Sequence, residues 1–121
     1  MLRSMMQIYI KGSVEAVEIY QKAFDAELVN ETKNEDGSYL HAELDVFGQI
    51  LAIAEARDKR IFGNTMQFCF HFGEGKEEIV KKAYEILKDG AQIEFPLGPC
   101  FFSPSMFGLT DKFGVNWCLF V

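Results

Sequence analysis

The sequence predicts an α+β fold in which one βαβββ module occurs twice in tandem. The segments MQIYIKGSVEAVEIYQKAFDAELVNE at 6–31 and MQFCFHFGEGKEEIVKKAYEILKDGAQIEF at 66–95 share the order strand, helix, strand. With 121 residues, of which 49% are hydrophobic and 25% charged, the composition is that of an ordinary globular domain. We therefore expect a single domain over 1–121, composed of a first module at 1–62 and a second module at 63–121.

The first module opens with residues 6–10, MQIYI, a short β-prone run. Over 13–24 the polar residues recur at three- and four-residue spacing, which is the period of an amphipathic helix. Ser13 is the expected N-cap of this helix. Asp25 follows it and tolerates the left-handed conformation of a helix end. Three strands should follow, at 27–33, 39–47 and 49–56.

The strand predicted at 39–47 alternates cleanly between polar and apolar residues, as expected for a sheet with one face in water. We expect His41 to lie on the exposed face of this strand. The polar face would carry Tyr39, His41, Glu43 and Asp45, and the apolar face Leu40, Ala42, Leu44 and Val46. The next strand contains ILAIA at 50–54, which predicts a central position, and residues 57–63 are typical of a linker.

The second module repeats this order. We expect a strand at 65–72, a helix at 76–89 closed by Gly90, and strands at 91–96, 103–110 and 115–121. The tight turn Asp111-Lys112-Phe113-Gly114 should fix the register of the last strand, because its Gly can take a positive φ. The prolines Pro96, Pro99 and Pro104 bracket a run that predicts an irregular loop.

Charge and cysteine content exclude several function classes. Only 12 basic residues against 18 acidic ones give a net charge of -6, which argues against nucleic acid as a partner. The start of the chain has no apolar run long enough for a signal or a membrane span. Three cysteines without a CxxC pair suggest neither a disulfide framework nor a zinc knuckle, so we expect a cytoplasmic protein. No glycine-rich strand-to-helix turn suits a nucleotide cofactor.

Three segments carry a resemblance to a known family: AVEIYQKAFDAELV at 16–29, DGSYLHAEL at 36–44 and GLTDKFGVNWCLFV at 108–121. Together they resemble the vicinal oxygen chelate superfamily, which includes glyoxalase I, extradiol dioxygenases and bleomycin-resistance proteins, and within it the PhnB-like branch. The resemblance implies a cupped eight-stranded mixed sheet with helices outside. It also implies a small-molecule cavity on the concave face and a homodimer.

Strand parity indicates which residues should line that cavity. In the strand at 65–72, the residues Met66, Phe68, Phe70 and Phe72 share a face suited to packing on a helix, so the alternate residues point the other way. The same argument places Met5 in the cavity from the first strand, and Asn116 and Phe120 from the last. The candidate cavity residues are Gln7, Tyr9, Glu55, Gln67, Cys69, His71 and Cys118. Within this set, His71 is a candidate general base, and Cys69 and Cys118 should approach each other across neighbouring strands.

Metal-dependent relatives carry their ligands on the first, fourth, fifth and eighth strands, positions that correspond here to Met5, Glu55, Gln67 and Cys118. Only Glu55 is a good hard ligand, whereas Met is soft, Gln is weak, and Cys prefers a different metal. We therefore predict no catalytic metal site and no cofactor. Glu55 is the single candidate ligand should a divalent metal ion bind.

The expected function is small-molecule binding by a protein of uncharacterised activity that lacks an intact catalytic metal site. Two alternatives stay open. One is a metal-dependent lyase, isomerase or dioxygenase, which would need Glu55 and further ligands from outside the usual positions. The other is a non-catalytic dimeric structural module, which the 12 phenylalanines favour.

Overall fold

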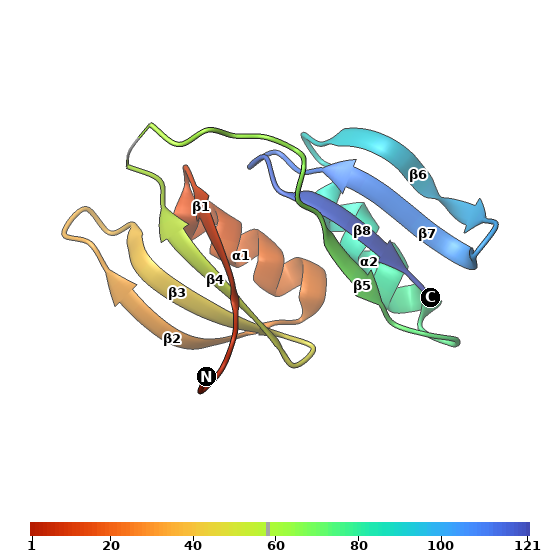
Figure 1. The fold of residues 1–121 in the computed structure, drawn as a ribbon, viewed down its shortest axis with the longest axis horizontal. Helices are drawn as coiled ribbons and strands as arrows, with labels where there is room; N and C mark the ends of the chain where they lie inside the picture. Colours follow the sequence, from red (N-terminus) through yellow and green to blue (C-terminus); the bar gives the residue numbers. More distant parts are fainter. Residues whose placement is uncertain (58) are drawn as a thin grey trace. The chain divides into compact units, whose positions relative to one another are not determined.

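The computed structural model describes residues 1–57 and 59–121 and contains two compact units, Met1–Arg60 and Ile61–Val121 (Figure 1). The first unit contains β1 (Met6–Ile10), α1 (Ser13–Phe24), β2 (Glu27–Lys33), β3 (Tyr39–Val46) and β4 (Gln49–Glu55). The second contains β5 (Phe68–His71), α2 (Glu77–Leu87), β6 (Gln92–Cys100), β7 (Ser103–Thr110) and β8 (Asn116–Phe120). The predicted α+β class and the tandem βαβββ order are confirmed. Among the described residues, no helix is long and apolar enough to cross a membrane.

In the described part of the chain, the eight strands form two four-stranded sheets with the same topology. The first sheet has the order β1-β4-β3-β2 and the second the order β5-β8-β7-β6. In each sheet the module's first strand pairs parallel with its last strand, and the remaining pairs are antiparallel. Both sheets are therefore mixed, and in both the parallel strands are joined by a long connection that contains the helix and the two antiparallel strands.

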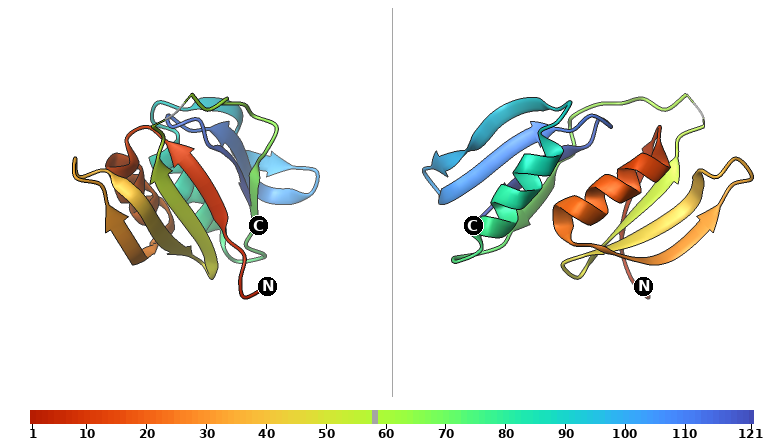
Figure 2. Two further views of the ribbon diagram at one scale, coloured as in Figure 1. Left: turned by 60° about the vertical axis from the view of Figure 1, so that its left-hand side comes forward. Right: turned by 180° about the vertical axis from the view of Figure 1, so that it is seen from behind.

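Each helix packs on one face of the sheet of its own unit (Figure 2). We call this the covered face and the opposite side the open face. In the first unit the covered face is the core, and its buried residues include Ala16, Val17, Tyr20, Ala23 and Phe24 of α1 with Leu44, Leu51 and Ile53 of the sheet. In the second unit the buried residues include Val80, Ala83 and Leu87 of α2 with Phe107, Leu109, Trp117 and Leu119. Burial of these side chains supplies the main driving force for folding.

A β-bulge divides β3 and changes which side chains face the helix. The pairing of β3 with β2 shifts register between Thr32 opposite His41 and Lys33 opposite Tyr39, which leaves Leu40 as the extra residue. Tyr39 is consequently buried and Leu40 exposed, the reverse of the simple alternation predicted for this end of the strand. From His41 to Val46 the apolar residues Ala42, Leu44 and Val46 are buried, as predicted, but Glu43, which was predicted on the water-facing side, is buried as well.

The second unit departs from the predicted strands in two places. β5 is shorter than the predicted 65–72, so Met66 and Gln67 precede the strand and are exposed. β6 is longer than the predicted 91–96 and forms a hairpin with β7, so the prediction of an irregular loop around the prolines is wrong. β6 lies at the edge of its sheet and has several register shifts, and prolines are tolerated at such positions. The linker predicted at 57–63 includes residue 58, which lies outside the described residues.

Candidate functional site

The open face of the first sheet carries a row of three residues from neighbouring strands. Gln7 of β1 is the register partner of Ala52 of β4, and Ala52 is also the partner of Glu43 of β3. Side chains on adjacent strands at paired positions point to the same face. The partner of Tyr9 on β4 is Ala54, two residues along, so Tyr9 lies on this face as well. The structure thus places Gln7 and Tyr9 opposite the helix, as strand parity predicts.

Glu43 is the chemical centre of this open face. It is a buried carboxylate, and both of its oxygens accept hydrogen bonds from charged or polar side chains. Nη1 of Arg3 donates to Oε2 at 2.8 Å and Nη2 to Oε1 at 2.9 Å, which is the bidentate fork geometry. Nε2 of His41 lies 2.9 Å from the same Oε1. We refer to Arg3, His41 and Glu43 as the Glu43 cluster.

The cluster fixes the charge of its carboxylate. The hydrogen bonds from Arg3 and then from His41 lower the pKa of Glu43 from its ordinary value of 4.5 to about 2, although burial opposes the shift. Glu43 is therefore ionised at neutral pH. His41 donates through Nε2 to Glu43, which orients the imidazole ring on the open face. His41 was expected on an exposed strand face, and it instead lies partly buried in this cluster.

Gln7 and Tyr9, which lie on the same face as the Glu43 cluster, are more exposed than Glu43. The guanidinium carbon of Arg60 lies 3.5 Å from the ring centroid of Tyr9, a cation–π contact within the first unit. Tyr9 and Gln7 are both exposed. The open face of the first sheet therefore combines one buried anion with polar and aromatic side chains around it.

The open face of the second sheet has a different chemistry. Cys69 of β5 and Cys118 of β8 are register partners, as predicted, and His71 is the partner of Phe120. The His71 and Phe120 rings stack with their centroids 4.6 Å apart, and Phe102 meets Phe120 edge to face at 5.2 Å. Sulfur and aromatic groups therefore dominate this face, and Cys69 and His71 are exposed on it.

Cys118 is a poor nucleophile in this setting. Desolvation by burial, followed by the proximity of Cys69, raises the pKa of Cys118 from 9.0 to about 11. The thiol is therefore protonated at neutral pH, whereas both nucleophilic attack and metal binding require the thiolate.

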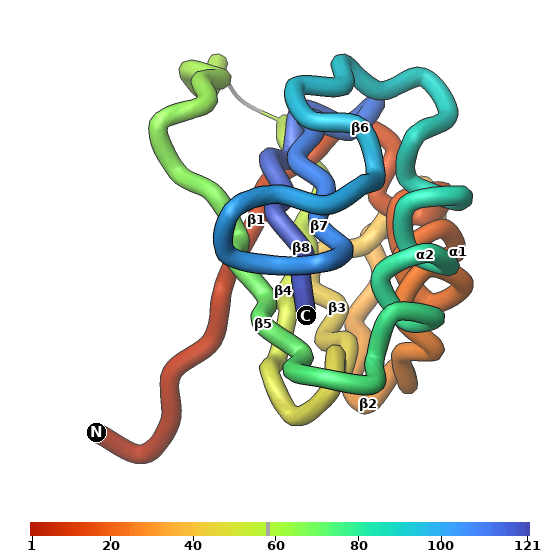
Figure 3. The backbone as a smooth tube through the Cα atoms, turned by 90° about the vertical axis from the view of Figure 1, so that its right-hand side faces the viewer, coloured from red at the N-terminus to blue at the C-terminus, as the bar shows by residue number. Residues whose placement is uncertain are grey.

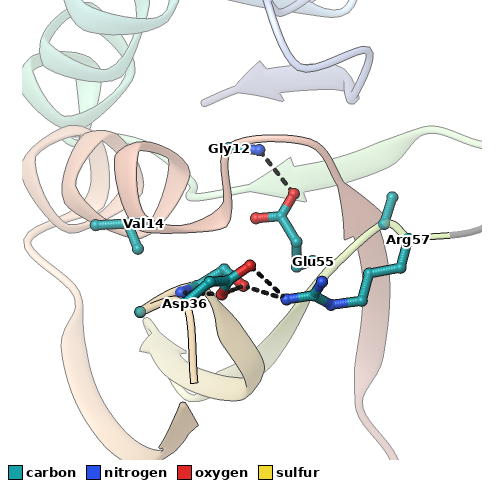
Figure 4. Close-up of a pocket in the computed structure, with 8 residues that line it drawn as sticks. Gly12, Val14, Asp36, Glu55 and Arg57 are labelled. Carbon is teal, nitrogen blue, oxygen red and sulfur yellow. Dashed lines mark hydrogen bonds and ion pairs between the residues drawn. The ribbon is translucent and has the colours of Figure 1, made fainter. Parts of the chain in front are cut away.

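Glu55 lies on the covered side of its sheet, not among the open-face residues. Its register partner is Ile10, a buried residue, and its carboxylate reaches the start of α1 (Figure 4). Oε2 accepts from the Gly12 amide at 3.1 Å, and Oε1 accepts from the amide and hydroxyl of Ser13 at 3.0 and 2.8 Å. Gly12 occupies the N-cap position predicted for Ser13, and no cap side chain bonds to the helix. Glu55 of β4 supplies this capping function instead.

The hydrogen bonds at the helix start determine the protonation of Glu55. Burial raises its pKa, but the bonds from Ser13 and Gly12 outweigh that effect and the pKa lies below the ordinary value. A carboxylate at a helix N-terminus also interacts favourably with the helix dipole. Glu55 lines a hollow of about 540 Å³ together with Gly12, Val14, Asp36, Gly37, Ser38, Ala56 and Arg57. Its position has a structural explanation that needs no ligand.

The residues at the family's metal-ligand positions do not fit a divalent metal ion. Both carboxylate oxygens of Glu55 are used at the start of α1. Gln67 precedes β5 and is exposed, and Cys118 is a protonated thiol at neutral pH. Across residues 1–57 and 59–121, no three His, Cys, Asp or Glu side chains gather in a group that could hold a metal ion. The donor set therefore supports no metal-dependent step.

Sequence reasoning missed the Glu43 cluster because its members come from distant segments. Arg3 and Glu43 are 40 residues apart, and no local pattern links them. The alternation of β3 placed His41 and Glu43 on the same face, which was the only available signal. The alternation of β3 could not show that Arg3, which precedes β1, would pair with the Glu43 carboxylate and cover it.

Comparisons with known proteins agree with this architecture. The family model of the Glyoxalase/Bleomycin resistance protein/Dioxygenase superfamily matches residues 5–119. The fold is similar to that of a PhnB protein from Bacillus cereus, with 24% identity, 98% of each chain covered and a TM-score of 0.83. It is also similar to protein PA1353 from Pseudomonas aeruginosa, with 20% identity, coverage of 99% of this chain and 97% of that one, and a TM-score of 0.80.

A third similar structure is the fosfomycin resistance protein FosX from Listeria monocytogenes. It shows 15% identity and a TM-score of 0.70, and the match covers 98% of this chain and 91% of FosX. No curated protein sequence matches the chain. At these levels of identity the solved structures establish the fold, and the chemistry has to be argued from the residues of this chain.

Proposed function

Because the chain belongs to the glyoxalase/bleomycin resistance protein/dioxygenase superfamily, we propose that it binds a small molecule on the open face of its first sheet without a resident metal ion. The observation that carries this proposal is Glu43, an ionised carboxylate buried on a sheet face that its own helix does not cover. A buried charge destabilises a fold unless it is paired, and replacing such a pair with apolar residues is often neutral or stabilising. A polar cluster at this position is therefore better explained by recognition than by stability.

The surroundings of Glu43 support the same conclusion. Gln7 and Tyr9 offer an amide, a phenol and an aromatic ring on the same face, and both are exposed. His41 adds an imidazole whose second ring nitrogen can form a hydrogen bond with a ligand. A few convergent polar groups around a defined charge are what fix the orientation of a small ligand.

The proposal is tested with the isotope-labelled chain and a small-molecule library, followed by NMR of backbone amides. Ligands should shift the amides of Gln7, Tyr9 and Glu43 more than those of α1, and EDTA should leave their Kd unchanged. Gln7→Ala should weaken binding, whereas the matched Gln21→Ala on α1 should not. Ligands that bind only after a divalent metal is added, or that shift α1 alone, would contradict the proposal.

The metal-dependent alternative has the fold likeness as its support. Similar structures include a mutant of FosX from Listeria monocytogenes complexed with Mn(II) and 1S,2S-dihydroxypropylphosphonic acid. For this chain a lyase, isomerase or dioxygenase activity requires further ligands, because the thiol of Cys118 is protonated at neutral pH and the amide oxygen of Gln67 is only a weak ligand. One Mn(II) ion retained per subunit in native mass spectrometry would support the metal-dependent alternative.

A homodimer is part of the proposal, and the dimeric structural module is the remaining alternative. The second unit exposes Phe95, Phe101 and Phe102, and exposed apolar side chains of this size favour a protein contact. The same native mass spectrum reports the number of subunits. If Phe102→Ala dissociated the dimer and left ligand binding intact, the contact and the binding site would be separate features.

A further inference from the structure

Glu43 is already bound to a planar cation, and that cation is an arginine of the same chain. The two Nη groups of Arg3 approach the two carboxylate oxygens at 2.8 and 2.9 Å. This fork arrangement matches the shape of a guanidinium group and gives the site geometric specificity as well as charge. The open face of the first sheet therefore displays a formed guanidinium-binding site.

The two partners are held very differently. The Glu43 side chain is 4% exposed and belongs to β3, inside the sheet. The Arg3 side chain is 50% exposed, and Arg3 belongs to the segment before β1 that has no regular secondary structure. Figure 3 shows the path of this segment from the N-terminus to β1. Met1 and Leu2, which precede Arg3, are exposed along their full length. The anion is thus part of the rigid scaffold, whereas the cation lies on a segment without regular secondary structure.

We propose that Glu43 recognises a guanidinium or amidinium group of a small-molecule ligand, and that Arg3 occupies this position until the ligand displaces it. The inference rests on the proposed function, because it names the ligand chemistry for the same open face. The hydrogen bond from His41 to Oε1 remains in both states and holds the carboxylate in place. The incoming group then replaces the two donors of Arg3.

The protonation and burial of Glu43 select the class of ligand. Its carboxylate is ionised at neutral pH and has little access to water, so an occupant without positive charge would leave a buried anion uncompensated. An alkylammonium ion supplies the charge but donates from a single point. A planar fork supplies both the charge and two parallel donors.

The test compares two arginines that pair with carboxylates in the same unit. Arg3→Ala frees the buried Glu43, and Arg57→Ala frees Asp36, which pairs with Arg57 at 2.7 Å with side-chain exposures of 55% and 56%. Each variant is titrated with methylguanidinium and with the neutral isostere N-methylurea, at constant ionic strength and neutral pH. Backbone amide shifts at His41 and Glu43 report occupancy. The double variant Arg3→Ala with Glu43→Gln removes the proposed recognition group.

Because Arg3→Ala removes the side chain that competes for Glu43, the Kd of this variant for methylguanidinium should be at least about tenfold lower than that of the wild type. Arg57→Ala should bind methylguanidinium with the affinity of the wild type. N-methylurea should bind to none of these proteins, and the double variant should lose the increased affinity for methylguanidinium. Equal affinity of Arg3→Ala and the wild type, or an equal gain in Arg57→Ala, would overturn the inference. If Arg3→Ala is too unstable for NMR, millimolar methylguanidinium should raise its Tm, and an unchanged Tm would count against the proposal.

These outcomes separate this inference from the function on which it rests. The library experiment uses the wild-type chain and asks whether any small molecule occupies the open face. Guanidinium ligands that bind there without displacing Arg3 would support the proposed function and refute the guanidinium site.

Discussion

The carboxylate of Asp111 accepts a hydrogen bond from the indole nitrogen of Trp117 at 2.8 Å, and both residues are buried. The other oxygen of Asp111 accepts from the amides of Phe113 and Val115 at 2.9 and 3.0 Å. One side chain therefore closes the turn between β7 and β8 and also anchors the largest side chain of the second core. Gly114 takes a φ of 88° in this turn, as its predicted role requires.

Asp111→Ala should destabilise the chain by about 2–4 kcal/mol, because it leaves the buried donors of Val115 and Trp117 without an acceptor. Urea unfolding followed by Trp117 fluorescence measures the change. Asp111→Asn retains one oxygen acceptor and should lose less. An Asp111→Ala variant as stable as the wild type would show that water or another group replaces the carboxylate.

The Glu43 cluster should make stability depend on pH in the acid range. The folded pKa of about 2 lies below the ordinary 4.5, so the contribution is complete above pH 4.5 and is lost as the pH falls toward 2. The difference in unfolding free energy between the wild type and Glu43→Gln should therefore shrink across this window. Urea unfolding at a series of pH values measures it, and a difference that is constant with pH would refute the assigned charge state.

Glu55 should behave as a helix cap. Glu55→Ala removes the acceptor for the amides of Gly12 and Ser13 and should destabilise the chain by about 0.5–2 kcal/mol. Glu35→Ala, a glutamate in an exposed turn, is the matched control and should have little effect. Isothermal titration calorimetry should give the same Mn(II) affinity for Glu55→Ala and the wild type. Weaker Mn(II) binding by the variant would show that Glu55 is a metal ligand.

Cys69 and Cys118 should form a disulfide when the chain is treated with the oxidant diamide. Neighbouring strands lie about 4.8 Å apart, within the range of Cα separations that a disulfide spans. Diamide accepts two electrons and two protons from the thiols, so the protein mass should fall by the mass of two hydrogens. Cys100→Ser should still form the bond and Cys69→Ser should not. Oxidation only to multimers would show that the thiols cannot meet within one chain.

The sequence was sufficient to predict the repeated module, the strand order along the chain and the faces of β1 and β8. Periodic burial dictates these features, and periodicity is visible locally. The exceptions have local physical causes. The bulge at Leu40 reverses the burial of Tyr39, and an edge position allows β6 to continue through Pro96 and Pro99.

The candidate site was predicted less completely, because its contacts are long-range. Parity alone placed Gln7 and Tyr9 on the side of the sheet that α1 does not cover, where the structure has them, and their role in binding stays a prediction. The partner that neutralises Glu43 and the helix start that engages Glu55 depend on which residues the fold brings together. A charged residue inside a strand pattern indicates a partner without identifying it.

The two sheets share a topology, yet the rows on their open faces differ. In the first sheet the row is Gln7, Ala52 and Glu43, and in the second it is Cys69, Cys118 and Gly108. The helices pack on the opposite side, so much of each sheet's hydrophobic core is independent of what these rows contain. In protein engineering, the residues on each open face can therefore be randomised separately while the residues on the covered face are left unchanged. One duplicated scaffold can therefore acquire two specificities by changing a few side chains in either half.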